Sequence, residues 1–377
     1  MSTPRLWSTF KITIRPKHLK TDVLLAQMWL SRAGTCPLSI TLGSKGYYTN
    51  SMRPLMQVFL LYCERWCEVR LSLPRAVMAQ LSPAKDRLPR LRKLHIEGFG
   101  HDTIDIFECA PQLRSFRLDS PIMPSMIKLP WSQLQSVYTG YQASDGCLEL
   151  LPLTPNLTEC ALYITPLAQR DPLSSVQLPH LRSITIFGDA STVLDHLLAP
   201  QLNKISIYLA GVAWRSTSQL VSLFSRCSIR TFFFDTHIGG QPPPDHEIIQ
   251  LLQAAPDLVD LDLGGCSSQS MTNSFLTQFT QCQGTADSTA LNLIPMLHTM
   301  TVDYEPSYFD FFAFADAVQL RMTSGVLKHI QIRCHTSGRT DPLGSAVRLR
   351  LHQLREMGLG VRVSHRGKEL FPAQSIS

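Results

Sequence analysis

Two groups of side chains in this sequence have the chemistry to recognise another molecule, one aromatic and the other acidic. They comprise Tyr138, Tyr163, Phe187, Tyr208 and Phe233, followed by Asp235, Asp260, Asp262 and Asp303. Exposed aromatic rings flanked by charge are favoured at the centres of protein–protein interfaces. We therefore expect these nine residues to bind a partner protein, provided that they point away from the core.

Residues that could do covalent or metal chemistry do not form a recognised pattern. Gly43-Ser-Lys-Gly46 lacks the spacing of a phosphate-binding loop, and His101-Asp102 has no nucleophile phrase beside it. Cys63 and Cys67 have the spacing of one helix face, but no second pair of Cys or His follows at the spacing of a zinc site. We predict a protein that is not an enzyme, without catalytic residues, cofactor or metal. A catalytic cluster assembled from distant residues is the alternative.

A repeated phrase predicts the strands that position the aromatic and acidic residues. Two of its copies read Leu88-Pro-Arg-Leu91-Arg-Lys-Leu94-His-Ile96 and Ala255-Pro-Asp-Leu258-Val-Asp-Leu261-Asp-Leu263. Its leading apolar residues are Leu91, Leu113, Leu134, Leu157, Leu181, Leu202, Ile229, Leu258, Leu297 and Leu327. The alternation at the end of each copy predicts a short strand with every second side chain buried. The nine recognition residues fall between the buried positions, and a slip of one residue would bury all of them.

The spacing of the copies predicts how the strands are arranged. The first seven steps between leading residues are 21 to 29 residues long, which is the period of leucine-rich repeats. A longer step contains a polar insertion at 281–290. We therefore expect an α/β fold: a leucine-rich-repeat-like solenoid of degenerate repeats, with a parallel sheet on its concave face and helices on its convex face. The alternative is a set of coincidental apolar phrases in an α/β protein rich in Leu and Pro.

Other segments complete the predicted organisation. Residues 1–83 form an α/β N-terminal segment with strands over 6–14, 37–42 and 69–74 and helices over 22–33 and 55–66. Leu24, Leu25, Met28 and Trp29 share the apolar face of the first of these helices. The repeat arc occupies 84–365, with return helices over 216–227, 245–255, 271–281, 308–323 and 344–357, and a frayed tail follows over 366–377.

The net charge of +6 hides an uneven distribution along the chain. Residues 1–100 carry 16 Lys and Arg against 5 Asp and Glu, residues 101–320 carry 9 against 21, and residues 321–377 carry 10 against 3. The basic side chains are dispersed among apolar positions, as on a solvated surface, and the acidic middle would repel a phosphate backbone. We do not expect nucleic acid to be a partner.

Composition places the chain among ordered proteins, with 44% hydrophobic and 17% charged residues. No apolar run has the length of a membrane span, and no secretory cleavage signal follows the basic N-terminus. We therefore expect no membrane partner and a cytoplasmic or nuclear location.

Four phrases near the N-terminus carry a resemblance to a known family. They are Pro4-Arg-Leu-Trp7, Trp29-Leu-Ser-Arg-Ala-Gly-Thr-Cys36-Pro-Leu-Ser-Ile40, Arg65-Trp66-Cys-Glu-Val-Arg-Leu-Ser-Leu-Pro74 and Leu88-Pro-Arg-Leu-Arg-Lys-Leu94. In order and approximate spacing they resemble the expanded F-box/leucine-rich-repeat-like proteins of mushroom-forming fungi. The degenerate repeats extend this resemblance to nearly the whole chain.

The resemblance implies a protein-recognition module similar to the substrate receptor of a ubiquitin ligase. In that family an F-box, which docks on a Skp-type adaptor of a cullin-RING ligase, stands just before the phrase that resembles Pro4-Arg-Leu-Trp7. Here the chain starts at that junction, so we expect the F-box to be missing from it, through a misplaced start codon or a loss of the ligase anchor. The adaptor is then expected as a partner only if an F-box lies upstream. The alternative is a stand-alone repeat scaffold unconnected to ubiquitin.

Overall fold

The repeated phrases form parallel strands in a mixed α/β structure. The computed structural model describes residues 3–14, 18–44, 52–98, 103–119, 124–143, 146, 149–165, 175–209, 211, 214–215, 217–236, 239–265, 271–281, 293–304, 310–334, 343–365 and 368–371. The chain divides into two compact units, Met1–Leu181 and Arg182–Ser377. This division lies inside the predicted repeat region. Residue 83, the predicted end of the N-terminal segment, falls between strands β3 and β4, which are paired neighbours in one sheet.

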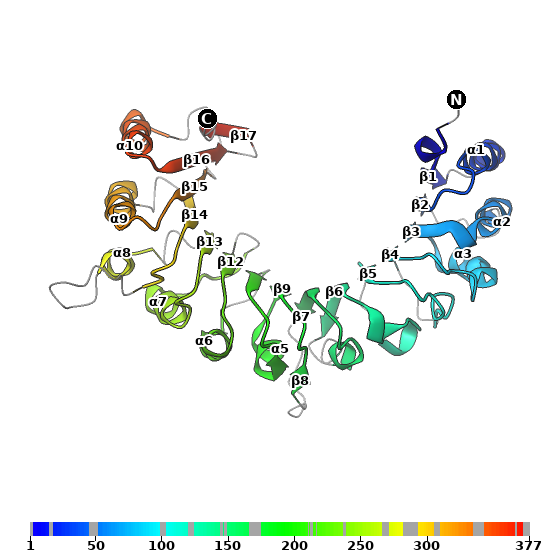
Figure 1. The fold of residues 1–377 in the computed structure, drawn as a ribbon, viewed down its shortest axis with the longest axis horizontal. Coiled ribbons are helices and arrows are strands. Elements are labelled where there is room, and N and C mark those ends of the chain that lie inside the picture. Colours follow the sequence, from blue (N-terminus) through cyan, green and yellow to red (C-terminus); the bar gives the residue numbers. More distant parts are fainter. Residues whose placement is uncertain are drawn as a thin grey trace. The chain divides into compact units, whose positions relative to one another are not determined.

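In the first unit, helices lie along one face of a parallel sheet whose strands follow in chain order (Figure 1). The strands are β1 (Thr9–Ile14), β2 (Leu38–Ser44), β3 (Trp66–Ser72), β4 (Lys93–Ile96), β5 (Ser115–Leu118), β6 (Ser136–Ala143) and β7 (Glu159–Thr165), and a short strand β8 (Val176–Gln177) follows. The α-helices are α1 (Leu19–Arg32), α2 (Arg53–Leu60) and α3 (Arg75–Met78). The 3₁₀ helices are η1 (Pro4–Trp7), η4 (Cys63–Arg65), η5 (Ala79–Ala84), η6 (Pro124–Met126), η7 (Trp131–Gln133) and η8 (Leu151–Leu153).

The second unit repeats this plan, with α-helices in the connections between its strands (Figure 1). Its strands are β9 (Ser183–Gly188), β10 (Leu197–Leu198), β11 (Lys204–Tyr208), β12 (Thr231–Asp235), β13 (Asp260–Gly264), β14 (Thr299–Tyr304), β15 (His329–Cys334), β16 (Gly360–His365) and β17 (Lys368–Phe371). Its helices are α5 (Ser191–His196), α6 (Thr217–Arg226), α7 (Asp245–Gln253), α8 (Asn273–Thr280), α9 (Phe311–Thr323) and α10 (Ser345–Glu356). The sheet order is β9-β11-β12-β13-β14-β15-β16-β17, and only β17 is antiparallel to its neighbour. The five predicted return helices are confirmed as α6 to α10.

In the copies that have a proline two residues before the leading residue, a turn in front of the strand explains it. In the copy at Ala255-Pro-Asp-Leu258, the backbone N–H of Leu258 donates to the carbonyl oxygen of Ala255 at 3.2 Å. The corresponding bonds in the other copies with a proline are 3.0 to 3.4 Å long. Proline fits the second position of such a turn, because its ring fixes φ near the required value and that position needs no N–H donor. The N–H of Val259 then donates to the carbonyl of Arg230 at 2.8 Å, which sets the register of β13 on β12.

The buried rows of the sheet match the alternation in the sequence. All ten leading residues of the phrase are buried, with exposures of 3% or less. In the second unit, one row of neighbouring strand residues is apolar throughout and runs Ile184, Ile205, Phe232, Leu261, Met300, Ile330 and Val361. Each of these side chains is at most 2% exposed. The predicted register is therefore confirmed, and the residues between these positions point to the other face of the sheet.

The predicted apolar face of the first helix is wrong for three of its four residues; the fourth, Trp29, is half-buried and its ring contacts Trp7 and Phe10. Leu24, Leu25 and Met28 are exposed on α1, by 65%, 43% and 40%, whereas Ala26 and Leu30 are fully buried. The small side chain of Ala26 lets the helix approach its neighbours closely, so the buried stripe is rotated away from the larger leucines.

Two further expectations near the chain ends also need correction. The helix predicted over 55–66 ends at Leu60, and Cys67 already belongs to β3, so Cys63 and Cys67 do not share a helix face. Strand pairing from Trp66 onward takes precedence over the helical pattern. Within the predicted frayed tail, Lys368–Phe371 forms β17, which pairs with the edge of β16 and is tied to it by an Arg362–Glu369 ion pair of 3.1 Å.

The described helices include none with the combination of length and apolar character that crossing a bilayer requires.

Candidate functional site

A group of aromatic and charged side chains gathers on the helix-free face of the second unit's sheet. We call it the aromatic–acid surface, and it consists of Phe187, Tyr208, Phe233, Asp235, Asp262, Gly264, Asp303 and Arg333. Strand register brings these residues together, because Tyr208 lies opposite Phe187 on β9 and opposite Asp235 on β12. Asp303 likewise lies opposite Arg333 on β15.

The aromatic part is a stack of three rings from neighbouring strands. The ring of Tyr208 stacks on Phe187, with centroids 4.6 Å apart and an interplanar angle of 14°. On its other side Phe233 lies 4.8 Å away at 37°. All three side chains are half-buried, so the stack presents ring edges and faces at the surface. Stacked rings hold one another in place, and a partner can pack on them without ordering mobile side chains.

The acidic part is an ion-pair network centred on one guanidinium group. Arg333 donates from Nη1 and Nη2 to both carboxylate oxygens of Asp262, at 3.1 and 2.6 Å, and from Nε to Asp303 at 2.8 Å. The same guanidinium lies 5.9 Å from the ring centroid of Phe233. Arg333 therefore joins the acidic and the aromatic residues into one rigid surface.

Gly264 makes room for this network. A Cβ atom at residue 264 would lie 2.9 Å from Nη2 of Arg333 and 3.1 Å from Cγ of Asp235. A side chain would therefore displace the guanidinium group, the carboxylate or both. Absence of a side chain on β13 is what allows charges from strands on either side of it to approach each other.

Burial and charge together determine the protonation of the network. Burial raises the pKa of Asp262 to about 6, although Arg333 opposes this by attracting the ionised carboxylate. The neighbouring carboxylates of Asp303 and Asp235 add to the rise. Burial lowers the pKa of Arg333, but the two aspartates outweigh it, so the pKa lies above its usual value and the guanidinium stays charged.

The raised pKa of Asp262 predicts a stability that depends on pH. The folded protein takes up a proton at Asp262 near pH 6, whereas the unfolded chain does so only near pH 4, so the free energy of unfolding should rise as pH falls through this window. The difference in unfolding free energy between the wild type and Asp262→Asn should change by up to about 3 kcal/mol between pH 7 and pH 4. Urea unfolding of both proteins at several pH values measures it. If the unfolding free energies of the two proteins changed with pH in the same way, the raised pKa of Asp262 would be contradicted.

The second unit corrects one sequence prediction, the exposure of Asp303, and separates Asp260 from the other acidic residues. Asp303 was expected to be exposed, but it is 3% exposed, because Arg333 covers it and the backbone N–H of Gly265 donates to it. Asp260 lies on β13 in an earlier row, where Thr231 donates to it at 3.4 Å, and it takes no recorded part in the Arg333 network. Whether Asp260 binds a partner stays a prediction.

The remaining two predicted aromatic residues belong to the first unit and form their own pair. Tyr138 and Tyr163 have ring centroids 6.0 Å apart in an edge-to-face arrangement. Burial, and a hydrogen bond with Tyr163, raise the pKa of Tyr138 to about 12. The guanidinium of Arg117 lies 3.9 Å from the centroid of the Tyr138 ring and covers part of that face.

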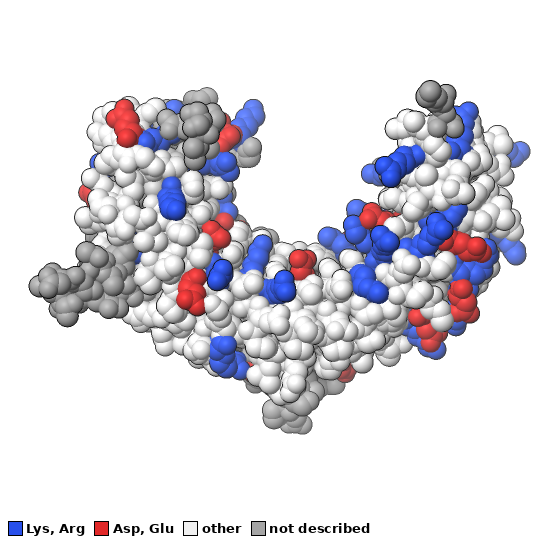
Figure 2. Space-filling model, viewed as in Figure 1, with Lys and Arg blue, Asp and Glu red and all other residues white. Residues whose placement is uncertain are grey.

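Several basic side chains of the first unit pair with acidic ones. In Figure 2, Lys and Arg lie side by side with Asp and Glu over this unit. Among the recorded ion pairs are Arg87–Glu64 at 2.9 Å, Lys93–Glu68 at 2.8 Å and Arg70–Glu97. These pairs account for only part of the positive charge over residues 1–100, where 16 Lys and Arg face 5 Asp and Glu.

Two arginines that contact the aromatic residues, Arg333 in the second unit and Arg117 in the first, were not predicted as site residues. Arg333 and Arg117 are at outward strand positions, but their partners follow only from the register between strands. The sequence did contain a signal for Arg333. It stands six residues after the leading residue of its copy of the phrase, which is also where Asp303 and Asp235 stand in their copies. Aligning the copies by their leading leucines would have put one basic residue in a row of acidic ones.

Comparisons with known proteins add no assignment. No protein-family model matches the chain, and no curated protein matches it at significant similarity.

Proposed function

We propose that this chain is a non-enzymatic protein-recognition module built as a leucine-rich-repeat-like solenoid, with the sheet on its concave face and helices on its convex face. The observation that carries the proposal is the aromatic–acid surface: three stacked, half-buried rings directly beside an ordered network of charges. Rigid aromatic side chains next to oriented charges are what interface hot spots are made of.

The charges of this surface favour a partner with basic side chains. Asp235, Asp262 and Asp303 contribute three carboxylates around the single guanidinium of Arg333. A lysine or arginine of a partner could lay its aliphatic stem on the rings of Tyr208 and Phe233 and direct its charge towards the carboxylates. We therefore propose a protein segment with exposed Lys or Arg as the ligand.

The resemblance to F-box/leucine-rich-repeat-like proteins supports a role similar to that of a substrate receptor in a ubiquitin ligase. In this proposal a Skp-type adaptor is a partner only where an F-box precedes the chain, and the location is cytoplasmic or nuclear. A stand-alone repeat scaffold with no link to ubiquitin is the second candidate. It uses the same surface and differs only in what else is attached to the module.

The proposal is tested by affinity capture of the full chain from its own cells, followed by mass spectrometry. The wild type is compared with the double variant Tyr208→Ala/Phe233→Ala and with Phe312→Ala, which removes a ring that is 49% exposed on α9. We expect partners that are retained by wild type and Phe312→Ala and lost from the double variant. Retention of the same proteins by all three would contradict the proposal.

For a partner identified in this way, binding affinity gives a quantitative check. Truncating a hot-spot ring costs about 2 kcal/mol or more of binding free energy, so Tyr208→Ala should raise the dissociation constant about 30-fold. Phe312→Ala should leave it unchanged. Co-capture of adaptor and cullin would favour the receptor role, and partners without them would favour the scaffold.

A further inference from the structure

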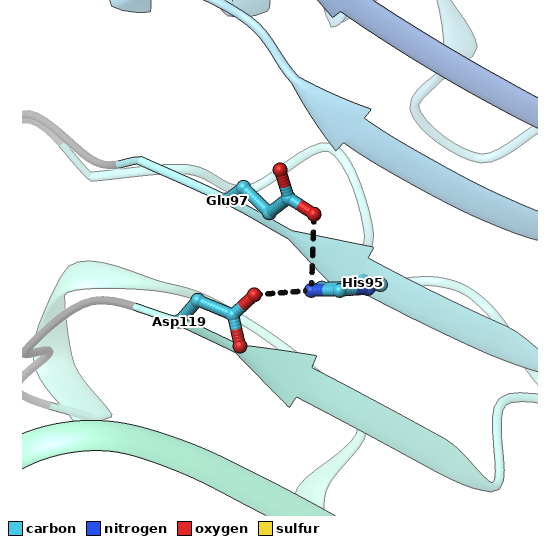
Figure 3. Close-up of side chains that lie close together, drawn as sticks. All are labelled: His95, Glu97 and Asp119. Carbon is cyan, nitrogen blue, oxygen red and sulfur yellow. Dashed lines mark hydrogen bonds and ion pairs between the residues drawn. The ribbon is translucent and has the colours of Figure 1, made fainter. Parts of the chain in front are cut away.

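Three potential metal ligands converge in the first unit, and none of them belongs to the aromatic–acid surface. One ligand atom from each of His95, Glu97 and Asp119 can be chosen so that all lie within 4.8 Å of one another (Figure 3). Nε2 of His95 is 2.7 Å from Oδ2 of Asp119 and 3.7 Å from Oε1 of Glu97. The side chain of His95 is 16% exposed, while the carboxylates are 27% and 30% exposed, so an ion could reach them from solvent.

The fold explains why these residues meet. His95 lies on β4 opposite Arg117 of β5. Glu97 and Asp119 each stand two residues further along, where every second side chain points to the same face of a sheet. The three donors therefore occupy three corners of a square on neighbouring strands, and Arg117 occupies the fourth. Spacing along the chain could not indicate this set, because Asp119 comes from a different copy of the phrase.

The donor set matches the ligands of a borderline divalent ion. One imidazole nitrogen and two carboxylate oxygens suit Zn²⁺, which takes His and Asp or Glu at about 2.0–2.2 Å. Three protein ligands would leave a fourth position for water or for a group of a partner protein. Ligand atoms on such an ion are about 3.4 Å apart, so Nε2 of His95 and Oδ2 of Asp119 would move apart from their present 2.7 Å when an ion binds between them.

Each carboxylate also has an arginine that can orient it. Nε of Arg70, at 2.6 Å, and its Nη2 both donate to Oε1 of Glu97, the oxygen measured from His95, so Oε2 would be the oxygen of Glu97 that binds the ion. Nε of Arg117 donates to Oδ1 of Asp119 at 2.9 Å, while Oδ2 faces His95. Carboxylate ligands of metal ions are commonly held by such outer hydrogen bonds. The positive charges of the two guanidinium groups also oppose a cation, which places the expected affinity at about micromolar rather than nanomolar dissociation constants.

We propose that His95, Glu97 and Asp119 form a binding site for one divalent transition-metal ion, with Zn²⁺ as the fitting ion. The site is independent of the proposed partner recognition, since its residues belong to the first unit and include none of the aromatic–acid surface.

The test uses the purified full chain in chelator-treated buffer, titrated with ZnCl₂ in a calorimeter. We expect one site of about micromolar dissociation constant, weakened at least tenfold in His95→Gln and in Asp119→Asn. The matched control is His246→Gln, which removes a histidine that also neighbours a carboxylate (Asp245, 3.9 Å) but is 74% exposed. This control should bind as the wild type does. Thermal unfolding without metal checks that each variant is folded.

Cobalt provides a spectroscopic readout of the ligands. Co²⁺ bound by a histidine and two carboxylates in a four-coordinate site should give visible absorption bands in the wild type and in His246→Gln, and these bands should be absent in His95→Gln. The proposal is overturned if the wild type does not bind Zn²⁺ at 1:1 stoichiometry, or if a folded His95→Gln variant binds Zn²⁺ and Co²⁺ as the wild type does.

Discussion

Replacing Arg333 by alanine is expected to lower the free energy of unfolding by about 3 kcal/mol at pH 7. The guanidinium is the recorded ion-pair partner of both Asp262 and Asp303, and the side chain of Asp303 is only 5% exposed. Without Arg333, the repulsion between these two negative charges would be less balanced by positive charge. The site also raises the pKa of Asp262 through burial. Removing one member of a buried charge network costs most through the charges that remain. Urea unfolding at pH 7 measures the effect.

The control for this prediction is Arg362→Ala on the neighbouring strand β16. Arg362 also pairs with a carboxylate, that of Glu369 at 3.1 Å, but its side chain is 55% exposed. Solvent replaces the lost partner there, so the expected cost is below about 1 kcal/mol. Equal losses in the two variants would show that the Arg333 network is no more than a surface ion pair. The loss in Arg333→Ala should also shrink in Arg333→Ala/Asp303→Asn, which removes one of the stranded charges.

Replacing Arg321 by alanine is expected to destabilise the second unit by about 4 kcal/mol. Arg321 lies on α9 with 1% exposure, although arginine is rarely so deeply buried. Its guanidinium donates to the carbonyl oxygens of Phe279 at 2.6 Å, of Ile294 at 3.1 Å, and of Leu293. It also covers the Phe279 ring at 4.0 Å from the centroid. Alanine would leave three carbonyl groups without this donor and a cavity the size of the side chain.

The matched control here is Arg226→Ala. Arg226 also donates to a backbone carbonyl, that of Ser222 at 3.0 Å, but in an exposed position near the end of α6. Its loss should cost less than about 0.5 kcal/mol. Hydrogen exchange gives a second, local readout, because protection should fall at α8 and at the start of β14 in Arg321→Ala and stay unchanged in Arg226→Ala. A global loss of below 1 kcal/mol would mean that water replaces the guanidinium without penalty.

The strands could be predicted because their signal is local. Most copies of the phrase carry their own turn, a leading leucine and two alternating apolar residues, as in Leu258, Leu261 and Leu263, which are buried as expected. The return helices were equally local in their pattern. Helix α1 shows where this reasoning fails: the buried stripe contains Asp22 and Ala26, and neither side chain carries a hydrophobic signal that competes with Leu24 and Leu25.

The candidate site could be predicted only in part. Its aromatic residues follow from strand alternation, since Tyr208 and Phe233 each stand between buried positions of one copy. The contacts that join them to charges depend on which residue lies opposite which across several strands, and Arg333 reaches Asp262 over 71 positions of sequence. The role of Gly264 could not be predicted from the sequence for the same reason. It matters only because the side chains of Arg333 and Asp235, from other strands, lie over it.

Arg321 has a consequence for how the gene can be edited. Its three carbonyl partners lie on both sides of the polar insertion, Phe279 before it and Leu293 and Ile294 after it. The side chain thus joins the end of α8 directly to the segment that leads into β14. An affinity tag inserted between residues 282 and 292 should therefore be accepted without loss of folding, because Arg321 still joins Phe279 to Leu293 and Ile294.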